Sequence, residues 1–285
     1  MLAATAIALG LAASSLVAPA PALASNGYVE TETTTYTVNP DGRRLDVAID
    51  IDFRNTSTIY AYSGVYVWAE HGASAVRATA NAGTASVRHV RRSGSFDQYV
   101  VDFAQVNPGG TRRVHFTYRL ASGAPRSSSD IRVGRAIASF CVVGQGDDGG
   151  TTTVVIPSAY KLTITSGSGS ELKQVAPTGT ATGSATWSTG QLGAPYAFWA
   201  CLSGTNDAGY TTFTTTSPAG REIDLEAWPE DPTWKTEVQG ELKTILPKLE
   251  AIVGRELPGR GPIVLREVAG SELGNYAGFY NPETG

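Results

Sequence analysis

The chain has 285 residues, of which 41% are apolar and 17% are charged, and its formal net charge is −4. The apolar content is sufficient for a hydrophobic core, and the length corresponds to one large domain or two smaller ones. The negative net charge argues against a general nucleic-acid-binding protein.

The first 24 residues have the features of a cleavable secretory signal of a bacterial type. The segment from Leu2 to Val17 carries no charge, and two prolines interrupt it before it reaches the ~20 apolar residues of a transmembrane helix. Ala22-Leu23-Ala24 then offers small residues at its outer positions, as signal peptidase requires. We expect cleavage before Ser25 and a secreted protein, extracellular or at the cell surface. The alternative is an uncleaved anchor; no later stretch has the composition of a membrane span.

Residues 25–228 are expected to form a β-domain. Apolar and polar residues alternate in segments 45–53, 99–103 and 113–120, which is the pattern of strands with one wet face. Shorter strands are expected near residues 65–68, 154–156, 161–164, 198–199 and 223–227. The stretch from residue 175 to residue 190 is polar and glycine-rich and is expected to be loop. Many short strands without helical breaks predict an antiparallel β-sandwich or saddle.

The pattern changes at residue 229, where a second domain (229–285) is expected to begin. Asp231 is a plausible helix cap and Pro232 suits the first helical position. One apolar helix face follows, with Pro247 as a kink or break and Gly254 as a natural terminator. Its members recur every three or four residues: Trp234, Val238, Leu242, Ile245, Leu249 and Ile252. Residues 263–265 read as a strand, so this part has the character of the incomplete start of an α/β domain.

The two cysteines, Cys141 and Cys201, both lie in strand-like segments. An even cysteine number in an exported chain predicts a disulfide between them, which would contribute ~4 kcal/mol on the chain-entropy model. The alternative, a nucleophilic cysteine, needs a partner base. The candidates are the three histidines: His71, His89 and His115.

Three groups of polar residues are candidate binding sites. Asp46, Asp50 and Asp52 share a strand face, but same-face carboxylates are ~6.6 Å or more apart, so a solvated face is favoured over a cation site. Asp147 and Asp148, in a glycine-rich loop, are a better calcium candidate, with a hairpin tip as the alternative. A basic patch that faces anionic polymer is a further hypothesis, which rests on Arg88, Arg91, Arg92, Arg112 and Arg113.

The order of parts resembles the zinc metallopeptidase family that includes membrane alanine aminopeptidase and leukotriene hydrolase. Residues 153–162 (TVVIPSAYKL) look like that family's saddle strand and IP-x-x-Y turn, and residues 196–200 (YAFWA) follow. Residues 246–254 (LPKLEAIVG) are similar to the helix that opens the catalytic domain. Residues 263–265 and 274–280 (GNYAGFY) stand where the family has an edge strand and a substrate-contacting segment.

The resemblance implies the N-terminal portion of a secreted metallopeptidase, a hydrolase of peptide or protein substrates, with a thermolysin-like domain beginning at residue 229. It assigns substrate contact by strand addition to Gly274, Asn275, Tyr276, Ala277 and Gly278, with a simple turn as the alternative. This run lacks the family's glutamate that grips a substrate amino terminus. The zinc-binding H-E-x-x-H motif and the catalytic glutamate are expected beyond residue 285, so zinc is expected in the full-length protein and no catalytic residue or metal ligand in this chain.

The competing hypothesis is a secreted, non-catalytic β-sandwich that binds polysaccharide or another protein. Tyr60, Tyr62 and Tyr66 are candidate stacking platforms for sugar rings. The amphipathic helix after residue 229 counts against this hypothesis, because a self-contained binding sandwich has no need of it.

Overall fold

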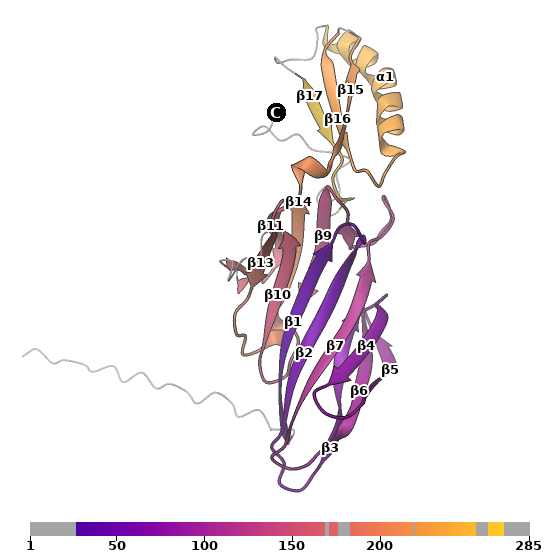
Figure 1. Ribbon diagram of the computed structural model, residues 1–285. Coiled ribbons are helices and arrows are strands. Elements are labelled where there is room, and N and C mark those ends of the chain that lie inside the picture. Colours follow the sequence, from indigo (N-terminus) through magenta and orange to yellow (C-terminus); the bar gives the residue numbers. More distant parts are fainter. Residues whose placement is uncertain (1–26, 169–170, 176–182, 219, 255–261, 271–285) are drawn as a thin grey trace, which may run out of the picture.

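The computed structural model describes residues 27–168, 171–175, 183–218, 220–254 and 262–270. An elongated body of β-strands carries, at one end, a small unit in which a helix packs beside three strands (Figure 1). The predicted signal peptide (1–24) and the candidate substrate segment Gly274–Gly278 lie outside the described residues.

The described residues form long strands and a single long helix. The elements are β1 (Tyr28–Asn39), β2 (Arg44–Asn55), β3 (Tyr62–Glu70), β4 (Ser74–Ala80), β5 (Ala85–Ser93), β6 (Phe96–Val106), β7 (Thr111–Ala121), β8 (Arg132–Val133), β9 (Ile137–Val143), β10 (Gly150–Pro157), β11 (Lys161–Gly167), β12 (Lys173–Val175), β13 (Ser184–Ser188), η2 (Pro195–Ala197), β14 (Trp199–Thr205), η3 (Asp207–Gly209), β15 (Thr211–Thr216), β16 (Glu222–Ala227), α1 (Trp234–Val253) and β17 (Ile263–Arg266).

The largest sheet has seven strands in the order β12-β13-β10-β1-β2-β7-β4. Alternation along β2 places its apolar residues on one face: Leu45, Val47, Ile49, Ile51 and Phe53 are all buried there. The opposite face of β2 is partly exposed and polar, as the period-two pattern predicts. Most pairs in this sheet are antiparallel, but β1 and β10 run parallel, with Glu32 opposite Gly150.

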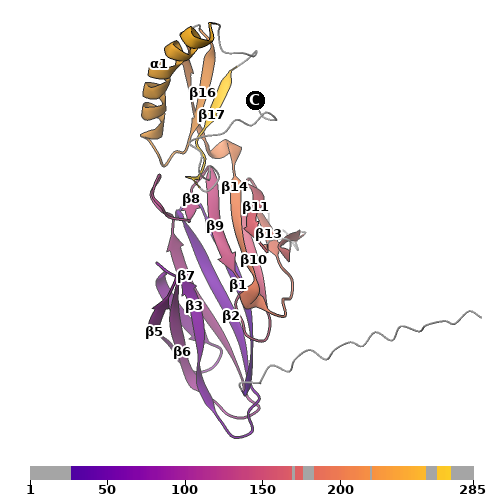
Figure 2. The same cartoon turned by 180° about the vertical axis from the view of Figure 1, so that it is seen from behind.

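Two smaller sheets cover the buried face of the large one. One has the order β11-β14-β9-β8 and the other β3-β6-β5. Residues of all three sheets contribute to one hydrophobic core, including Phe140 from β9 and Val67 from β3. Figure 2 shows the two small sheets from behind, at different heights along the long strands of the large sheet. A two-layer β-structure with a divided second layer results, and none of its sheets is closed.

The C-terminal unit is a three-stranded sheet, β15-β16-β17, with α1 against it (Figures 1 and 2). Strands β16 and β17 are parallel, and α1 is the connection between them. A small core joins the sheet to the helix through Ile223, Leu225 and Leu246. Gly254 ends α1 in the left-handed conformation (φ 69°), which a glycine adopts without steric cost, so its predicted role as terminator is confirmed.

The mainly β fold and the strands predicted from alternation are confirmed, but three details differ. The sheets are not purely antiparallel, because β1–β10 and β16–β17 are parallel pairs. The stretch expected to be loop contains β13, which pairs with β10. The helix begins at Trp234 and runs through Pro247 without a break, so Pro232 lies before its first turn.

Candidate functional site

A groove of about 1170 Å³ lies beside the edge of β3 and the end of β9, over the inner face of β1. Among the described strands, β3 pairs only with β6, and the two-residue β8 leaves the Cys141–Val143 part of β9 without a strand neighbour on that side. The groove is therefore lined by two strand edges that belong to different sheets. Its floor and walls are contributed by β1, β3 and β9, the loop 144–149 and the segment around η2.

Aromatic side chains are concentrated along this groove. Tyr66 on β3, Tyr196 on η2 and Trp199 on β14 expose 60%, 68% and 48% of their surface. Exposed aromatic rings that gather along one groove are typical of binding surfaces, because leaving apolar rings in contact with water is unfavourable. The groove thus has the lining of a ligand site, with rings contributed by separate elements.

Two glutamates lie on the inner face of β1, where a core strand ordinarily carries apolar residues. Glu30 and Glu32 are 5% and 4% exposed, and they line the groove together. Alternate residues of a strand share a face, which brings the two carboxyl groups side by side, and they are hydrogen-bonded to each other. The pair could not be predicted from the sequence, because β1 lacks the apolar alternation that marks the other strands.

The local environment favours the protonated form of this pair. Burial, together with the charges of Asp147 and Asp148, raises the pKa of Glu30 to about 7, against the opposing effect of its hydrogen bond with Glu32. Burial, followed by the hydrogen bond to Glu30 and the nearby negative charges, raises the pKa of Glu32 well above its usual value. The proton shared by the pair therefore belongs to Glu32, and Glu30 accepts it.

The glycine-rich loop between β9 and β10 lies directly against β1. Glu30 N–H donates to the Asp148 carboxylate (2.8 Å), and Glu32 N–H donates to the Gly149 carbonyl (3.1 Å). A Cβ at Gly146 would stand 2.5 Å from the Gly149 carbonyl oxygen, so a side chain cannot be accommodated at Gly146. The loop therefore extends the pairing of β1 with β10. It is neither the calcium-binding loop nor the free hairpin tip that the sequence suggested.

Gln145 ties this loop to the edge of β3. Trp68 N–H donates to the Gln145 side-chain oxygen (3.3 Å), and the Gln145 amide nitrogen donates to the Trp68 carbonyl (2.8 Å). The side-chain amide therefore occupies the position of a neighbouring strand at Trp68. It closes one point of the β3 edge and fixes the distance between the two sheets beside the acidic pair.

A second link between the sheets lies beneath the groove. The Tyr36 hydroxyl donates to Glu70 (2.8 Å) and accepts from the Val143 N–H (3.3 Å), while the Tyr118 hydroxyl also donates to Glu70. These bonds connect β1, β3, β7 and β9 through buried polar groups. Burial raises the pKa of Glu70 despite the two tyrosine hydrogen bonds.

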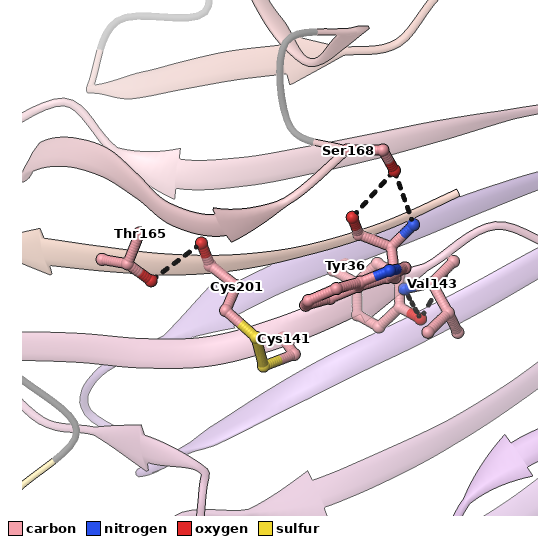
Figure 3. Close-up of a disulfide and its surroundings, with 7 residues drawn as sticks. Tyr36, Cys141, Val143, Thr165, Ser168 and Cys201 are labelled. Carbon is pink, nitrogen blue, oxygen red and sulfur yellow. Dashed lines mark hydrogen bonds between the residues drawn. A yellow bond between two sulfur atoms is a disulfide. The ribbon is translucent and has the colours of Figure 1, made fainter. Parts of the chain in front are cut away.

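The predicted Cys141–Cys201 disulfide is confirmed. Cys141 on β9 and Cys201 on β14 are directly opposed in the antiparallel register, and their Cα atoms are 3.9 Å apart. Figure 3 shows the bridge beside Tyr36 and Val143, with Thr165 Oγ1 donating to the Cys201 carbonyl (3.1 Å). No free thiol is left, so the nucleophilic-cysteine alternative is wrong.

The histidines do not assemble a metal site, but two of them share a carboxylate. Asp97 lies 3.0 Å from His71 Nδ1 and 3.0 Å from His89 Nε2, and hydrogen bonds from His89 and His71 lower the pKa of Asp97. These three residues come from different parts of the β3–β6–β5 sheet, which the sequence did not reveal. His115 lies elsewhere and pairs with Asp50 (2.7 Å).

Most of the remaining candidates pair with neighbouring residues: the aspartates on the outer face of the large sheet, and the arginines on β5 and β7. The aspartates of β2 each pair with a basic group: Asp46 with Arg44 and Arg119, Asp50 with His115, and Asp52 with Arg113. The arginine patch is dispersed: Arg88 pairs with Asp102, Arg91 bonds Gln98, Arg92 bonds Gly94, and Arg112 bonds two carbonyls of the 82–104 region. Tyr62 packs against Tyr28 and Phe53, so of the proposed stacking tyrosines only Tyr60 and Tyr66 are exposed.

Within the described residues, no three His, Cys, Asp or Glu side chains are grouped so that they would hold a metal ion. In the same part of the chain, no helix is both long enough and apolar enough to cross a membrane. No protein-family model matches the chain, and no curated protein sequence matches it.

Proposed function

We propose that this chain is the N-terminal part of a secreted zinc metallopeptidase that hydrolyses peptide bonds in peptide or protein substrates. In this proposal the β-rich body forms the saddle that holds the substrate, and the unit of β15–β17 and α1 is the start of a thermolysin-like catalytic domain. Gly274, Asn275, Tyr276, Ala277 and Gly278 are then the edge-strand residues that contact substrate.

The observation that carries this proposal is the incompletely covered apolar face of α1. Its N-terminal half packs on the small sheet through Trp234, Val238 and Leu242. Its C-terminal half exposes Ile245, Leu249 and Ile252, the last by 84%. Three large apolar residues on one helix face indicate a further protein layer, and the remainder of a catalytic domain would supply it.

The described residues do not fit a zinc site, since no group of three suitable ligands exists among them. A catalytic zinc ion needs three protein ligands and an open fourth position. The proposal therefore assigns the ligands to an H-E-x-x-H helix and a later glutamate encoded beyond residue 285, within ~40 residues. No catalytic step is assigned to the described residues.

The test compares this chain with the product of the extended reading frame. The extended protein should contain about one zinc per molecule and cleave peptides, whereas residues 25–285 alone should do neither. Changing the motif glutamate to glutamine should abolish hydrolysis and leave the zinc content unchanged. A stop codon after residue 285, or an extension that lacks the motif, would overturn the proposal.

A substitution in α1 tests the same proposal through packing. Ile252→Glu should leave the melting temperature of the 25–285 chain unchanged, because this side chain is exposed there. In the extended protein the same substitution should cost roughly 2–4 kcal/mol, because it would bury an unpaired charge. Glu241→Gln, on an exposed position of the same helix, is the matched control. Equal effects in both proteins would contradict the predicted covering layer.

The second candidate function is a surface module that binds polysaccharide, and the aromatic lining of the groove favours it. Tyr66, Tyr196 and Trp199 are exposed along the groove, and flat rings stack on the apolar faces of sugars. Binding of β-linked glucose or N-acetylglucosamine hexasaccharides, measured by calorimetry, tests it. Lack of binding, or binding that Tyr196→Ala and Trp199→Ala leave unchanged, would reject it.

A further inference from the structure

No basic side chain among the described residues forms an ion pair with Glu30 or Glu32, the acidic pair of β1. Glu30 and Glu32 line the groove, and Asp147, from the loop against β1, acts on both of them. The basic groups that line the same groove are His71 and Arg92, and both belong to the β3–β6–β5 side. His71 is engaged with Asp97, and Arg92 with the Gly94 carbonyl.

Independent evidence for a missing partner comes from buried polar atoms. Glu32 is only 4% exposed, and its Oε2 atom is buried and has no hydrogen-bond partner among the described residues. The hydroxyl oxygens of Thr34 and Thr152, which are opposed in the β1–β10 register, also have no partner among the described residues, but these two residues do not line the groove. Leaving a buried acceptor without a donor costs roughly 1–3 kcal/mol, so the unpartnered Oε2 of Glu32 indicates a group that is bound in the working protein.

The chemistry of this oxygen restricts the missing group. Glu32 donates its proton to Glu30, so the unpartnered Oε2 can only accept a hydrogen bond and its partner has to be a donor. A surplus of carboxyl groups in a poorly solvated site favours a donor that carries positive charge. Ammonium and guanidinium groups have both properties, with three and five N–H donors respectively.

Aromatic rings line the same groove as the acidic pair. On one side, Gln145 holds Trp68 to the loop that carries Asp147, and Tyr66 is two residues further along β3. On the other side, a Cβ at Gly150 would meet Pro195 at 3.3 Å, so the loop also abuts the η2 turn that presents Tyr196. Cations are attracted to the faces of such rings, and Arg91 already lies 5.9 Å over the Trp68 ring in this protein.

We propose that Glu30, Glu32 and Asp147 form a recognition site for a basic side chain, lysine or arginine, of an extended peptide held in the groove between Tyr66 and Tyr196. The inference concerns binding by the described chain and requires neither zinc nor hydrolysis. It therefore stands or falls separately from the proposed peptidase activity.

The binding test uses the 25–285 chain and blocked pentapeptides, N-acetylated and C-amidated, so that the side chain is the only cation. Pentalysine and pentaarginine should bind in calorimetry, whereas penta(Nε-acetyl-lysine), of similar length and no charge, should not. A β-linked hexasaccharide is the second probe. Binding of the hexasaccharide without binding of the basic peptides would overturn the proposal in favour of a sugar site.

Matched variants locate the site. Glu30→Gln should lower the affinity for pentaarginine roughly tenfold or more, because it removes the charge that Glu30 gains on binding and leaves the shape unchanged. Glu32→Gln leaves a single acceptor oxygen at that position and should lower the affinity to a smaller extent. Asp52→Asn removes one charge from the outer face of the same sheet and should change the affinity by less than about twofold. Equal losses in all three variants would indicate non-specific attraction and reject the site. Circular dichroism melts establish that each variant is folded.

Proton release on binding distinguishes direct contact between Glu30 and the cation from a purely structural role of Glu30. Glu30 faces Glu32 on β1 and Asp147 and Asp148 from the loop, and its pKa lies at about 7. A bound cation favours the ionised form, so binding should release a proton, and affinity should rise roughly tenfold from pH 6 to pH 8. The released proton is measured by calorimetry in buffers of different ionisation enthalpy. Binding without proton release in the wild type would contradict the role of Glu30.

Discussion

At the scale of single residues, the inner face of β1 is the least ordinary feature of the core. It presents Glu30, Glu32 and Thr34 before the core residues Tyr36 and Val38. Buried carboxyl groups without a cation are expensive while ionised, and here they share a proton instead. The free energy of unfolding should therefore depend on pH through these residues.

The first prediction concerns Glu30→Gln. The folded-state pKa of Glu30 is raised from 4.5 to about 7, so its favourable contribution is complete below pH 4.5 and is lost as pH rises through 7. At pH 8 the glutamine variant should thus be more stable than the wild type by on the order of 2–3 kcal/mol, and near pH 4.5 the difference should vanish. Urea unfolding at the two pH values measures it.

Asp52→Asn is the control for this experiment, since its carboxylate lies on the exposed face of β2 and pairs with Arg113. It should show no comparable gain at pH 8. A pH-independent difference between Glu30→Gln and the wild type would mean that Glu30 is not titrating in the folded protein near neutral pH.

At the scale of elements, α1 is fixed to the β-body through its first turn. Asp231 Oδ1 accepts from Thr233 N–H (3.2 Å) and Trp234 N–H (3.1 Å), which are unpaired amides of a helix start. The same aspartate pairs with Arg126 of the 122–131 loop (2.9 Å). Asp231 therefore accepts amide hydrogens at the helix start, but it lies two residues before the N-cap, Thr233, and so is not itself the predicted cap residue. It also joins the two parts of the molecule.

The second prediction follows for Asp231→Ala. Loss of the amide acceptor and of the Arg126 pair should lower stability by about 1–2 kcal/mol and speed hydrogen exchange in the first turn of α1. Glu237→Ala is the control, because Glu237 also contacts Arg126 but is mostly exposed; it should cost less than about 0.5 kcal/mol. Unchanged exchange at Thr233 and Trp234 would show that Asp231 does not hold the helix start.

The third prediction concerns the bridge between β9 and β14. It closes a chain separation of 60 residues, so its reduction should lower the free energy of unfolding by about 4 kcal/mol on the chain-entropy model. Urea unfolding with and without reductant measures the loss, and a Cys141→Ala/Cys201→Ala variant should reproduce it. A loss below about 1 kcal/mol would contradict the prediction, because it would mean that the disulfide removes little conformational entropy from the unfolded chain.

At the scale of the whole molecule, a seven-stranded sheet supports two smaller sheets, and the space beside their edges is the candidate site. Among the described residues, side-chain links cross this space, including Gln145 with Trp68 and Tyr36 with Glu70 and Val143. The sheets are held apart by these links, so the groove is formed before any ligand arrives.

The fourth prediction tests these links as determinants of groove geometry. Gln145→Ala removes both hydrogen bonds to Trp68 and should lower the affinity for pentaarginine severalfold, although Gln145 carries no charge. Gln105→Ala, which removes a surface bond to Asn107 away from the groove, is the control and should leave the affinity unchanged. The outcome that contradicts the prediction is equal affinity of Gln145→Ala and wild type.

Export is also a property of the whole molecule, and it remains a prediction. Intact mass and N-terminal sequencing of secreted material should give a chain that starts at Ser25. Material that begins at Met1 and fractionates with membranes would contradict the predicted cleavage.

The sequence by itself determined the strands with clean alternation, the helix at 234–253, its glycine terminator and the disulfide pairing. These features depend on local periodicity, or on there being only one possible cysteine pair. The tertiary structure decided which strands share a sheet, that β1 and β10 run parallel, and that Glu30, Trp68, Gln145 and Tyr196 line one groove. The reason is physical: strand periodicity reports which face of a segment is buried, but not which distant segment buries it. Polar residues that face a groove, as on β1, interrupt the apolar periodicity, so their position in a site cannot be predicted until it is known how the sheets assemble.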